Sequence, residues 1–303
     1  MFFKYKEFQL IPEYNKFKKI DPISIHETVR KYHIYLWRKK ERLLVIYTDF
    51  YQKEDFYRID LHAQLRESNI PTNDLISCGL CSDHLDFFML YDWLEGEDLS
   101  GVISGLSETE QYRLGIQSGK ILKRVHSLSL IYNEKPVKKS SEIEALIRKY
   151  ENDPVCMEKY PCIKVFVDFL KESNHKDPER YVFLHGDYNI NNLIYNKGEL
   201  SIIDWVYGCA GEPWEDFTGN IVNAQISPFF AMGQIDGYFD HKVPDEFWKE
   251  LSVFTAAHQL ELLDKDLNEE LIVNQHEYTM KEYCNMSETI PCYYKDREKI
   301  ILS

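Results

Sequence analysis

The first third of the chain carries short apolar runs that are rich in aromatic and β-branched residues, a composition that favours strands. Residues 34–37 and 43–47 are two such runs on either side of a charged turn, which is the pattern of a β-hairpin. Residues 75–79 and 85–91 predict a second pair of strands. Between the two pairs, residues 53–68 carry an imperfect apolar stripe at helical spacing. We therefore expect this part to be a strand-rich lobe.

From residue 107 onward the hydrophobic pattern changes to helical spacing. Ser107 and Glu110 have the spacing of a capping box. The residues that follow place Leu114, Ile121 and Val125 on one apolar face. A strand-rich part followed by a helical part predicts an α+β fold. Further helices are expected within 138–176, 247–263 and 269–285.

One stretch in the helical part combines strand-like runs with acids and amides. Residues 182–184 read as a short buried strand, and Asp187 follows it in a turn. Asn192 comes five residues later, and residues 200–203 form another strand-like run that ends at Asp204. A tight turn joins the two runs, as in a hairpin. The two carboxylates and the amide are thus expected to meet at the ends of neighbouring strands.

Such a group of oxygen donors suits phosphoryl transfer, which needs a positioned hydroxyl and a divalent metal at the phosphates. Mg²⁺ prefers oxygen ligands, usually one or two carboxylates together with water and phosphate. Asp187 would orient the acceptor hydroxyl and accept its proton, while Asn192 and Asp204 would hold the metal. His185 and Asn189 are expected to support the loop. Taken singly, an aspartate after a strand is more often an ordinary turn residue.

Two motifs in this stretch match a known family. His185-Gly186-Asp187, followed after four residues by Asn192, and then Ile203-Asp204-Trp205 resemble the catalytic and metal-binding loops of the aminoglycoside phosphotransferase and choline kinase superfamily. These enzymes are small-molecule relatives of the protein kinases. Further segments with the same likeness are 90–98, 119–127 and 227–239.

The resemblance implies a two-lobed, protein-kinase-like α+β fold. Residues 1–91 would form a small strand-rich lobe that binds the nucleotide, and residues 92–303 a larger helical lobe with the catalytic and substrate-binding residues. It also implies a phosphotransferase that moves the γ-phosphate of ATP or GTP to a hydroxyl of a small molecule, with Mg²⁺ as cofactor. In such folds the adenine bonds to the backbone that connects the lobes. The residues at that place are Tyr91, Asp92, Trp93 and Leu94.

The chain departs from the family pattern at one point. The lysine that normally grips the α- and β-phosphates would fall near Val45 or Ile46, in a run that contains no lysine. Asp60 is the best acid on the following helix, but its usual partner is missing. Either another cation substitutes, or the protein has lost activity and binds nucleotide or a partner. The cations in nearby turns are Lys39, Lys40, Arg42 and Lys53.

The net charge of the chain bears on which class of acceptor molecule it would bind. The chain has 36 basic and 50 acidic residues, a net charge of −14. This excess argues against nucleic acid as a partner and suits a cationic small molecule. The resemblance makes an aminoglycoside-like sugar, and with it antibiotic resistance, the leading hypothesis; choline, ethanolamine, a macrolide or a homoserine-like metabolite stay open. Candidate acceptor-binding carboxylates, each alternatively a helix cap or a surface residue, are Glu212, Glu215, Asp216, Asp236, Glu261 and Asp264.

Seven cysteines, an odd number, favour reduced thiols. Cys78 and Cys81 have CxxC spacing, but a second pair is missing and His84 is a poor substitute, so ordinary thiols are expected rather than a zinc site. No run approaches the roughly 18 apolar residues of a membrane span. The first residues are mixed polar and aromatic, without the apolar core of a signal peptide. We therefore expect a cytoplasmic protein without a membrane partner.

Overall fold

The computed structural model of the chain describes residues 8, 10–48, 57–81, 86–130, 136, 138–173, 175–265 and 267–295. The chain divides into two compact units. Unit 1 comprises Met1–Gly96 and Ser201–Ile203, and unit 2 comprises Glu97–Leu200 and Asp204–Ser303. None of the described helices is long and apolar enough to cross a membrane. All seven cysteines lie in the described part, and none of them forms a disulfide bond there.

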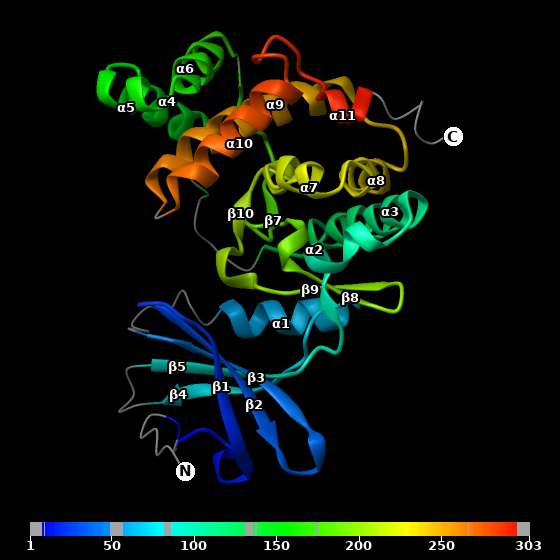
Figure 1. The fold of residues 1–303 in the computed structure, drawn as a ribbon. Helices are drawn as coiled ribbons and strands as arrows, with labels where there is room; N and C mark the ends of the chain where they lie inside the picture. Colours follow the sequence, from blue (N-terminus) through cyan, green and yellow to red (C-terminus); the bar gives the residue numbers. More distant parts are fainter. Residues whose placement is uncertain are drawn as a thin grey trace. The chain divides into compact units, whose positions relative to one another are not determined.

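Unit 1 is built on one antiparallel sheet with the strand order β1-β2-β3-β5-β4 (Figure 1). The expected hairpin is confirmed, since β2 pairs with β3 along its length. The expected helix is described from Tyr57, as α1 (Tyr57–Glu67). The strands are β1 (Phe17–Ile25), β2 (Val29–Leu36), β3 (Glu41–Tyr47), β4 (Leu75–Cys81) and β5 (Asp86–Asp92).

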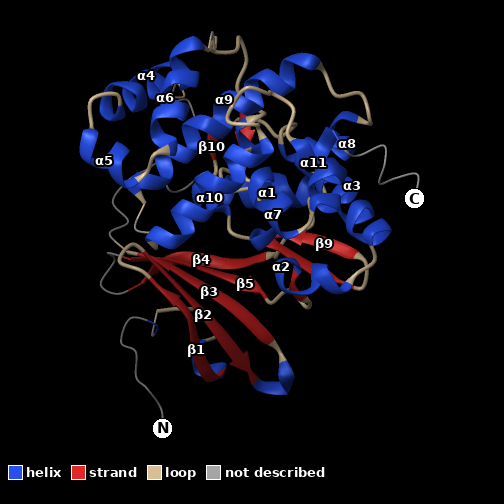
Figure 2. Ribbon diagram, turned by 45° about the horizontal axis from the view of Figure 1, so that its top comes forward, coloured by secondary structure: helices blue, strands red, loops and turns tan. Residues whose placement is uncertain are grey.

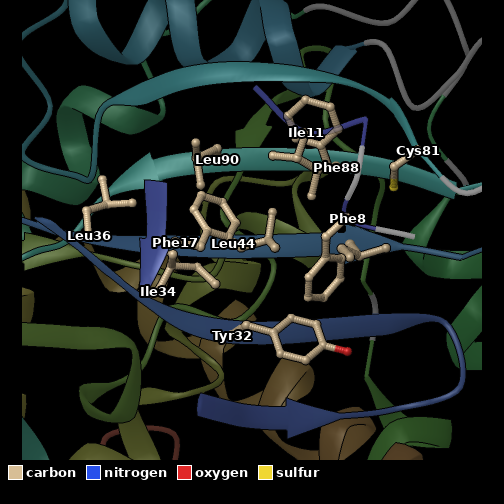
Figure 3. Close-up of a cluster of buried hydrophobic side chains, with 11 residues drawn as sticks. Phe8, Ile11, Phe17, Tyr32, Ile34, Leu36, Leu44, Cys81, Phe88 and Leu90 are labelled. Carbon is tan, nitrogen blue, oxygen red and sulfur yellow. The ribbon is translucent and has the colours of Figure 1, made fainter. Parts of the chain in front are cut away.

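This sheet buries side chains on both faces. Successive residues of a strand point to opposite faces, and here Leu44 and Leu90 belong to one buried cluster while Val45 and Met89 belong to another. The first cluster also includes Phe8 (Figure 3). Burial on both sides explains why β3 and β5 read as continuous apolar runs rather than as alternating ones.

Unit 2 is mainly helical, as predicted, with short strands inserted near its centre (Figure 2). β7 pairs with β10, and β6, β8 and β9 form a second small sheet. The strands are β6 (Glu97–Asp98), β7 (Val182–Leu184), β8 (Leu193–Asn196), β9 (Glu199–Ile202, which ends in unit 1) and β10 (Cys209–Gly211). The helices are α2 (Leu99–Val102), α3 (Glu108–Val125), α4 (Lys139–Tyr150), α5 (Pro154–Lys159), α6 (Cys162–Glu172), α7 (Asn220–Ile226), α8 (Pro228–Phe239), α9 (Asp245–Glu261), α10 (Glu269–Glu282) and α11 (Cys292–Lys295).

Helices α3 and α8 pack so closely that their backbones come into contact. The capping-box prediction for α3 is confirmed, because the Ser107 side chain accepts a hydrogen bond from the backbone N–H of Glu110. A Cβ atom on Gly115 of α3 would lie 2.2 Å from the carbonyl oxygen of Phe230, and one on Gly233 of α8 would lie 2.2 Å from that of Tyr112. Only glycine therefore permits this contact, which forms the frame that carries the loops described next.

Candidate active site

The loop after β7 holds the carboxylate of Asp187 in a fixed orientation. One oxygen, Oδ1, accepts a hydrogen bond of 2.7 Å from the side-chain amide of Asn189. The other, Oδ2, accepts one of 2.8 Å from the amide of Asn192, which also donates to the main-chain oxygen of Asp187 at 2.8 Å. Asp187 itself is exposed. The loop thus presents an oriented carboxylate to solvent, and it brings Asp187 and Asn192 together as the sequence predicts.

Gly186 lets this loop pass close to another part of the chain. Its φ is +82°, a left-handed conformation that side chains disfavour. A Cβ atom on Gly186 would also lie 2.2 Å from the carbonyl oxygen of Tyr207. Both observations make glycine necessary at the residue that precedes Asp187.

His185 is a buried support of the loop rather than an acid or base. Its Nδ1 accepts a hydrogen bond of 3.3 Å from the backbone N–H of Asp187, which places the ring proton on Nε2. The ring packs against Trp205 at 4.7 Å between centroids and against Tyr188 at 5.7 Å. The hydroxyl of Tyr188 in turn donates to the main-chain oxygen of Ser118 on α3 at 2.9 Å. The loop is therefore anchored to the α3 frame.

Asp216 lies beneath the same loop. It is fully buried, so an acceptor molecule in solvent cannot contact it. Its Oδ2 accepts hydrogen bonds from the backbone N–H of His185 at 2.8 Å and from Nε2 of His126 at 3.0 Å, and its Oδ1 accepts one from the N–H of Gly186 at 2.8 Å. Burial raises the pKa of Asp216, but these hydrogen bonds outweigh it and hold the pKa below its usual value. Asp216 thus fixes the loop in its ionised form.

Asp204 follows β9 with φ and ψ of 68° and 62°, the left-handed region. It begins a short helical turn, Trp205–Tyr207, whose residues contact His185 and Gly186. The amide nitrogen of Asn192 is occupied by Asp187, so its oxygen Oδ1 is the atom that a metal would take. A carboxylate and an amide oxygen are the kinds of ligand that Mg²⁺ takes together with water and phosphate, so the residue types of Asp204 and Asn192 fit the expected metal.

The connecting segment expected to bind adenine begins inside β5. Tyr91 is buried, and its hydroxyl bonds to Nε2 of His62 at 3.0 Å. Asp92 donates its backbone N–H to the oxygen of Asp74 at 3.0 Å, and its carboxylate accepts a hydrogen bond from Arg42 at 2.6 Å. Trp93 and Leu94 lie beyond the end of the strand. Of these four residues, Trp93 and Leu94 are therefore the two whose backbone groups lie outside the sheet.

The position of the expected phosphate-gripping lysine is apolar. Val45 is 4% exposed and packs with Phe87, Met89 and Tyr91. Asp60, the acid expected to pair with such a lysine, is exposed. The guanidinium of Arg58 lies 4.6 Å from the ring centroid of Tyr47 at the end of β3. Among the substitutes considered, Arg42 pairs with Asp92, and Lys53 lies outside the described residues.

The other acidic residues expected at an acceptor pocket fall into two groups. Asp236 is fully buried and accepts hydrogen bonds from the hydroxyls of Tyr112 and Tyr294, so the structure places it inside the protein. Glu212 is also buried, at 6% exposure, and lies beside His175. The second group consists of Glu215 and Glu261, which are partly exposed, and Asp264, which is exposed.

A buried lysine that the sequence did not single out organises part of this second group. Lys139 Nζ lies 3.1 Å from Glu261, 3.2 Å from Glu142 and 3.5 Å from Glu215. Burial lowers the pKa of Lys139, but the three carboxylates outweigh this and raise it above its usual value. Lys139 in turn helps His258 to hold the pKa of Glu261 at about 2, against burial, which raises it. The cluster keeps more negative than positive charge.

Comparison by sequence gives a family. The model of the family described as Phosphotransferase enzyme family (APH) matches residues 19–248, most of the chain. The chain belongs to this family. Comparison with curated proteins gives no match. The expected enzyme class, a small-molecule phosphotransferase with a hydroxyl acceptor, is thereby confirmed.

Solved structures of phosphotransferases share the fold. Aminoglycoside 2'-phosphotransferase-IIIa, in its GDP complex, is 13% identical with a TM-score of 0.69 over 93% of this chain and 97% of that one. A thermostable mutant of aminoglycoside phosphotransferase APH(4)-Ia is 14% identical, with a TM-score of 0.64 over 90% and 97% of the two chains. An amicoumacin kinase is 11% identical, with a TM-score of 0.62 over 91% of each. The protein-kinase-like α+β fold is therefore confirmed.

In this phosphotransferase, the sequence indicates the loop that contains Asp187 and Asn192 but not the distant residues that support it. Asn189 was expected to be only a turn residue, yet it also orients Asp187. His126 follows the last residue of α3, and its contact with Asp216 spans 90 positions of the sequence. A polar residue at the end of an apolar helix face was the one available indication of that contact.

Proposed function

We propose that the protein transfers the γ-phosphate of ATP or GTP to a hydroxyl group of a small, cationic molecule. The observation that carries this proposal is the exposed carboxylate of Asp187, with each oxygen oriented by one asparagine amide. A group held this way is pre-organised to receive a hydroxyl proton, and positioning is most of what such enzymes contribute.

In the proposed mechanism, Asp187 accepts a hydrogen bond from the acceptor hydroxyl and takes its proton as the new O–P bond forms. The bond from the γ-phosphorus to the β,γ-bridging oxygen breaks, and ADP or GDP leaves. Asn189 and Asn192 keep the carboxylate in place through the reaction. Asn192 Oδ1 and the carboxylate of Asp204 would hold Mg²⁺, which neutralises charge on the phosphate oxygens when bound. His185, Gly186 and Asp216 act only through the loop, by fixing its backbone.

For the nucleotide, we propose residues 1–91 as the binding part, with Tyr91, Asp92, Trp93 and Leu94 as the segment that meets the base. Residues 92–303 would supply catalysis and the acceptor site. The choice between ATP and GTP is left to experiment, because backbone contacts do not reveal the base. Similar folds have been solved with both kinds of nucleotide, AMP-PNP with amicoumacin kinase and GDP with aminoglycoside 2'-phosphotransferase-IIIa.

For the acceptor, we propose an amino-sugar of the aminoglycoside type, and with it a role in antibiotic resistance. Glu215 and Glu261 sit in a cluster with Glu142 that carries three carboxylates around the one ammonium of Lys139. The surplus negative charge would attract an ammonium group. Related folds have been solved with hygromycin B and with streptomycin. Asp264, three residues after Glu261, would add a further carboxylate, whereas the buried Glu212, Asp216 and Asp236 would not contact the acceptor.

A second candidate function follows from Val45, the apolar residue at the position where the phosphate-gripping lysine is expected. A kinase fold without its phosphate-gripping lysine could bind a nucleotide or a protein partner without turnover. The experiment that separates the two is a phosphoryl-transfer screen over amino-sugars and amino-alcohols with ATP and GTP, with Asp187→Ala as the matched control. We expect turnover of at least one acceptor by the natural protein and none by the variant. Nucleotide binding without turnover of any acceptor would favour the second function.

Replacing Asp204 with alanine is expected to abolish Mg²⁺-dependent nucleotide binding, because it removes the one carboxylate proposed to hold the metal. The measurement is a thermal-shift or calorimetric titration with ATP and with GTP, each with and without Mg²⁺. Asp245→Ala, at the exposed start of α9, is the control and should bind like the natural protein. Unchanged metal dependence in Asp204→Ala would remove Asp204 from the site.

A further inference from the structure

A second group of metal-ligand side chains lies in unit 2, apart from the catalytic loop. His175 and Asp177 come from the segment between α6 and β7, and Glu212 follows β10. One ligand atom from each of these three residues lies within 4.8 Å of the others. Gly211, just before Glu212, pairs with Val182 at the start of β7, whereas Asp187 lies beyond the other end of that strand. The group is therefore separated from Asp187 by the length of β7.

The contact between His175 and Glu212 does not have the geometry of a hydrogen bond. Nε2 of His175 lies 3.1 Å from Oε1 of Glu212, yet neither atom makes a hydrogen bond in the described part of the chain. Glu212 is more than nine-tenths buried, so water does not compensate. A buried carboxylate oxygen without a donor is costly. Two donors bound to one tetrahedral Zn²⁺ at about 2.0 Å lie about 3.3 Å apart, close to the observed spacing.

The surrounding residues orient these side chains as they do around bound metals. Nδ1 of His175 bonds to Oε2 of Glu250 on α9 at 2.6 Å, which directs Nε2 toward Glu212. Metal-binding histidines usually donate their second ring N–H to a carboxylate in this way. Both oxygens of Asp177 are held by Ser140 at the start of α4, one by its backbone N–H at 2.9 Å and the other by its hydroxyl at 2.8 Å.

Charge at this group is unbalanced. Three carboxylates, those of Asp177, Glu212 and Glu250, surround one imidazole. The ammonium of Lys138 lies 3.9 Å from Asp177, on an exposed side chain. A divalent cation would offset the surplus negative charge.

We propose that His175, Asp177 and Glu212 bind one Zn²⁺ ion, with water in the fourth position and Glu250 supporting His175. An imidazole nitrogen with two carboxylate oxygens favours zinc over Mg²⁺, which takes oxygen ligands alone. The ion would tie the segment that leads into β7 to β10 and, through Glu250, to α9 (Figure 1). This gives Glu212 a role other than acceptor binding, and it does not depend on the proposed phosphoryl transfer.

The test is zinc binding by the full chain that carries Asp204→Ala, so that the proposed Mg²⁺ site lacks its carboxylate during the measurement. After treatment with a chelator, the protein is titrated with Zn²⁺ in competition with a chromophoric chelator, and separately with Co²⁺. We expect one Zn²⁺ per chain and the intense visible absorption of four-coordinate Co²⁺. Zinc should also raise the thermal midpoint. Absence of stoichiometric binding would overturn the proposal without any further variant.

Substitutions then assign the ligands. Glu212→Gln and His175→Gln, each in the same background, should weaken zinc binding at least ~100-fold, and Glu250→Gln about 10- to 100-fold. The matched controls are Glu144→Gln on α4 and His241→Gln, both exposed, and they should bind zinc like the parent. Circular dichroism verifies that each variant is folded. A folded Glu212→Gln protein with unchanged zinc affinity would overturn the assignment, as would equal losses in the controls.

Discussion

Replacing Asp187 with asparagine is expected to lower kcat by roughly 10²- to 10⁴-fold while nucleotide affinity changes little. Asparagine keeps the shape of the side chain and can still accept a hydrogen bond from Asn189 or Asn192, so the loop should persist. It cannot take a proton from the acceptor hydroxyl. The expected loss corresponds to about 3 to 5 kcal/mol of activation free energy. The measurement is steady-state kinetics with an acceptor from the screen, together with calorimetric nucleotide binding.

Asp168→Asn on α6 is the control, since that aspartate is exposed and pairs only with Lys164 one turn away. Its kcat should equal that of the natural protein. If Asp187→Asn kept more than about a tenth of the natural kcat, proton acceptance by Asp187 would not be an important part of catalysis.

Replacing Asp216 with asparagine should destabilise the protein by about 3 kcal/mol and lower kcat without removing any group that touches the substrate. The buried carboxylate accepts hydrogen bonds from His126, His185 and Gly186. The asparagine side chain has an NH₂ group in place of one carboxylate oxygen. This NH₂ group would face a buried N–H donor, and the loss of a buried hydrogen bond to a charged group costs several kcal/mol. Urea unfolding followed by circular dichroism measures the free-energy difference. In Asp168→Asn the change should stay within ~1 kcal/mol, as for other exposed pairs.

The lowered pKa of Asp216 predicts that the stability of the folded protein depends on pH in the acidic range. The pKa of Asp216 is lower in the folded protein than its usual value of 3.8. Its ionised form therefore contributes stability at neutral pH, and this contribution is lost as the pH falls below 3.8 through the folded pKa. The Asp216→Asn variant should lack this part of the acid dependence. Parallel stability curves for the two proteins below pH 4 would show that Asp216 does not carry it.

Local patterns were enough to predict several elements and the contact between Asp187 and Asn192. The hairpin of β2 and β3 has aromatic and β-branched runs around a charged turn, and α3 begins at a capping box; both are short-range features. Asp187 and Asn192 are five positions apart, so their contact also depends on local chain geometry. Such relations can be seen in the sequence because neighbours in the chain decide them.

Other features depend on contacts between distant residues. Helix α8 is buried on nearly all sides from Phe230 to Gly237, so it lacks the polar face by which a helix is usually recognised. Lys139 is 122 positions from Glu261, and His175 is 75 from Glu250. The sequence therefore indicated candidate acidic residues but not the lysine and the histidine that pair with some of them.

The close packing of α3 and α8 at their glycines limits where this protein can be mutated to change the acceptor that it phosphorylates. Tyr188 and His126 attach the catalytic loop to α3, and neither Gly115 nor Gly233 leaves room for a methyl group. Variants with larger residues at Gly115 or Gly233 are therefore expected to misfold. Helix α4 contains no glycine and carries Lys139 and Glu142 at the acidic cluster. Directed evolution of acceptor range would therefore start at α4, where changes of side chain leave the frame intact.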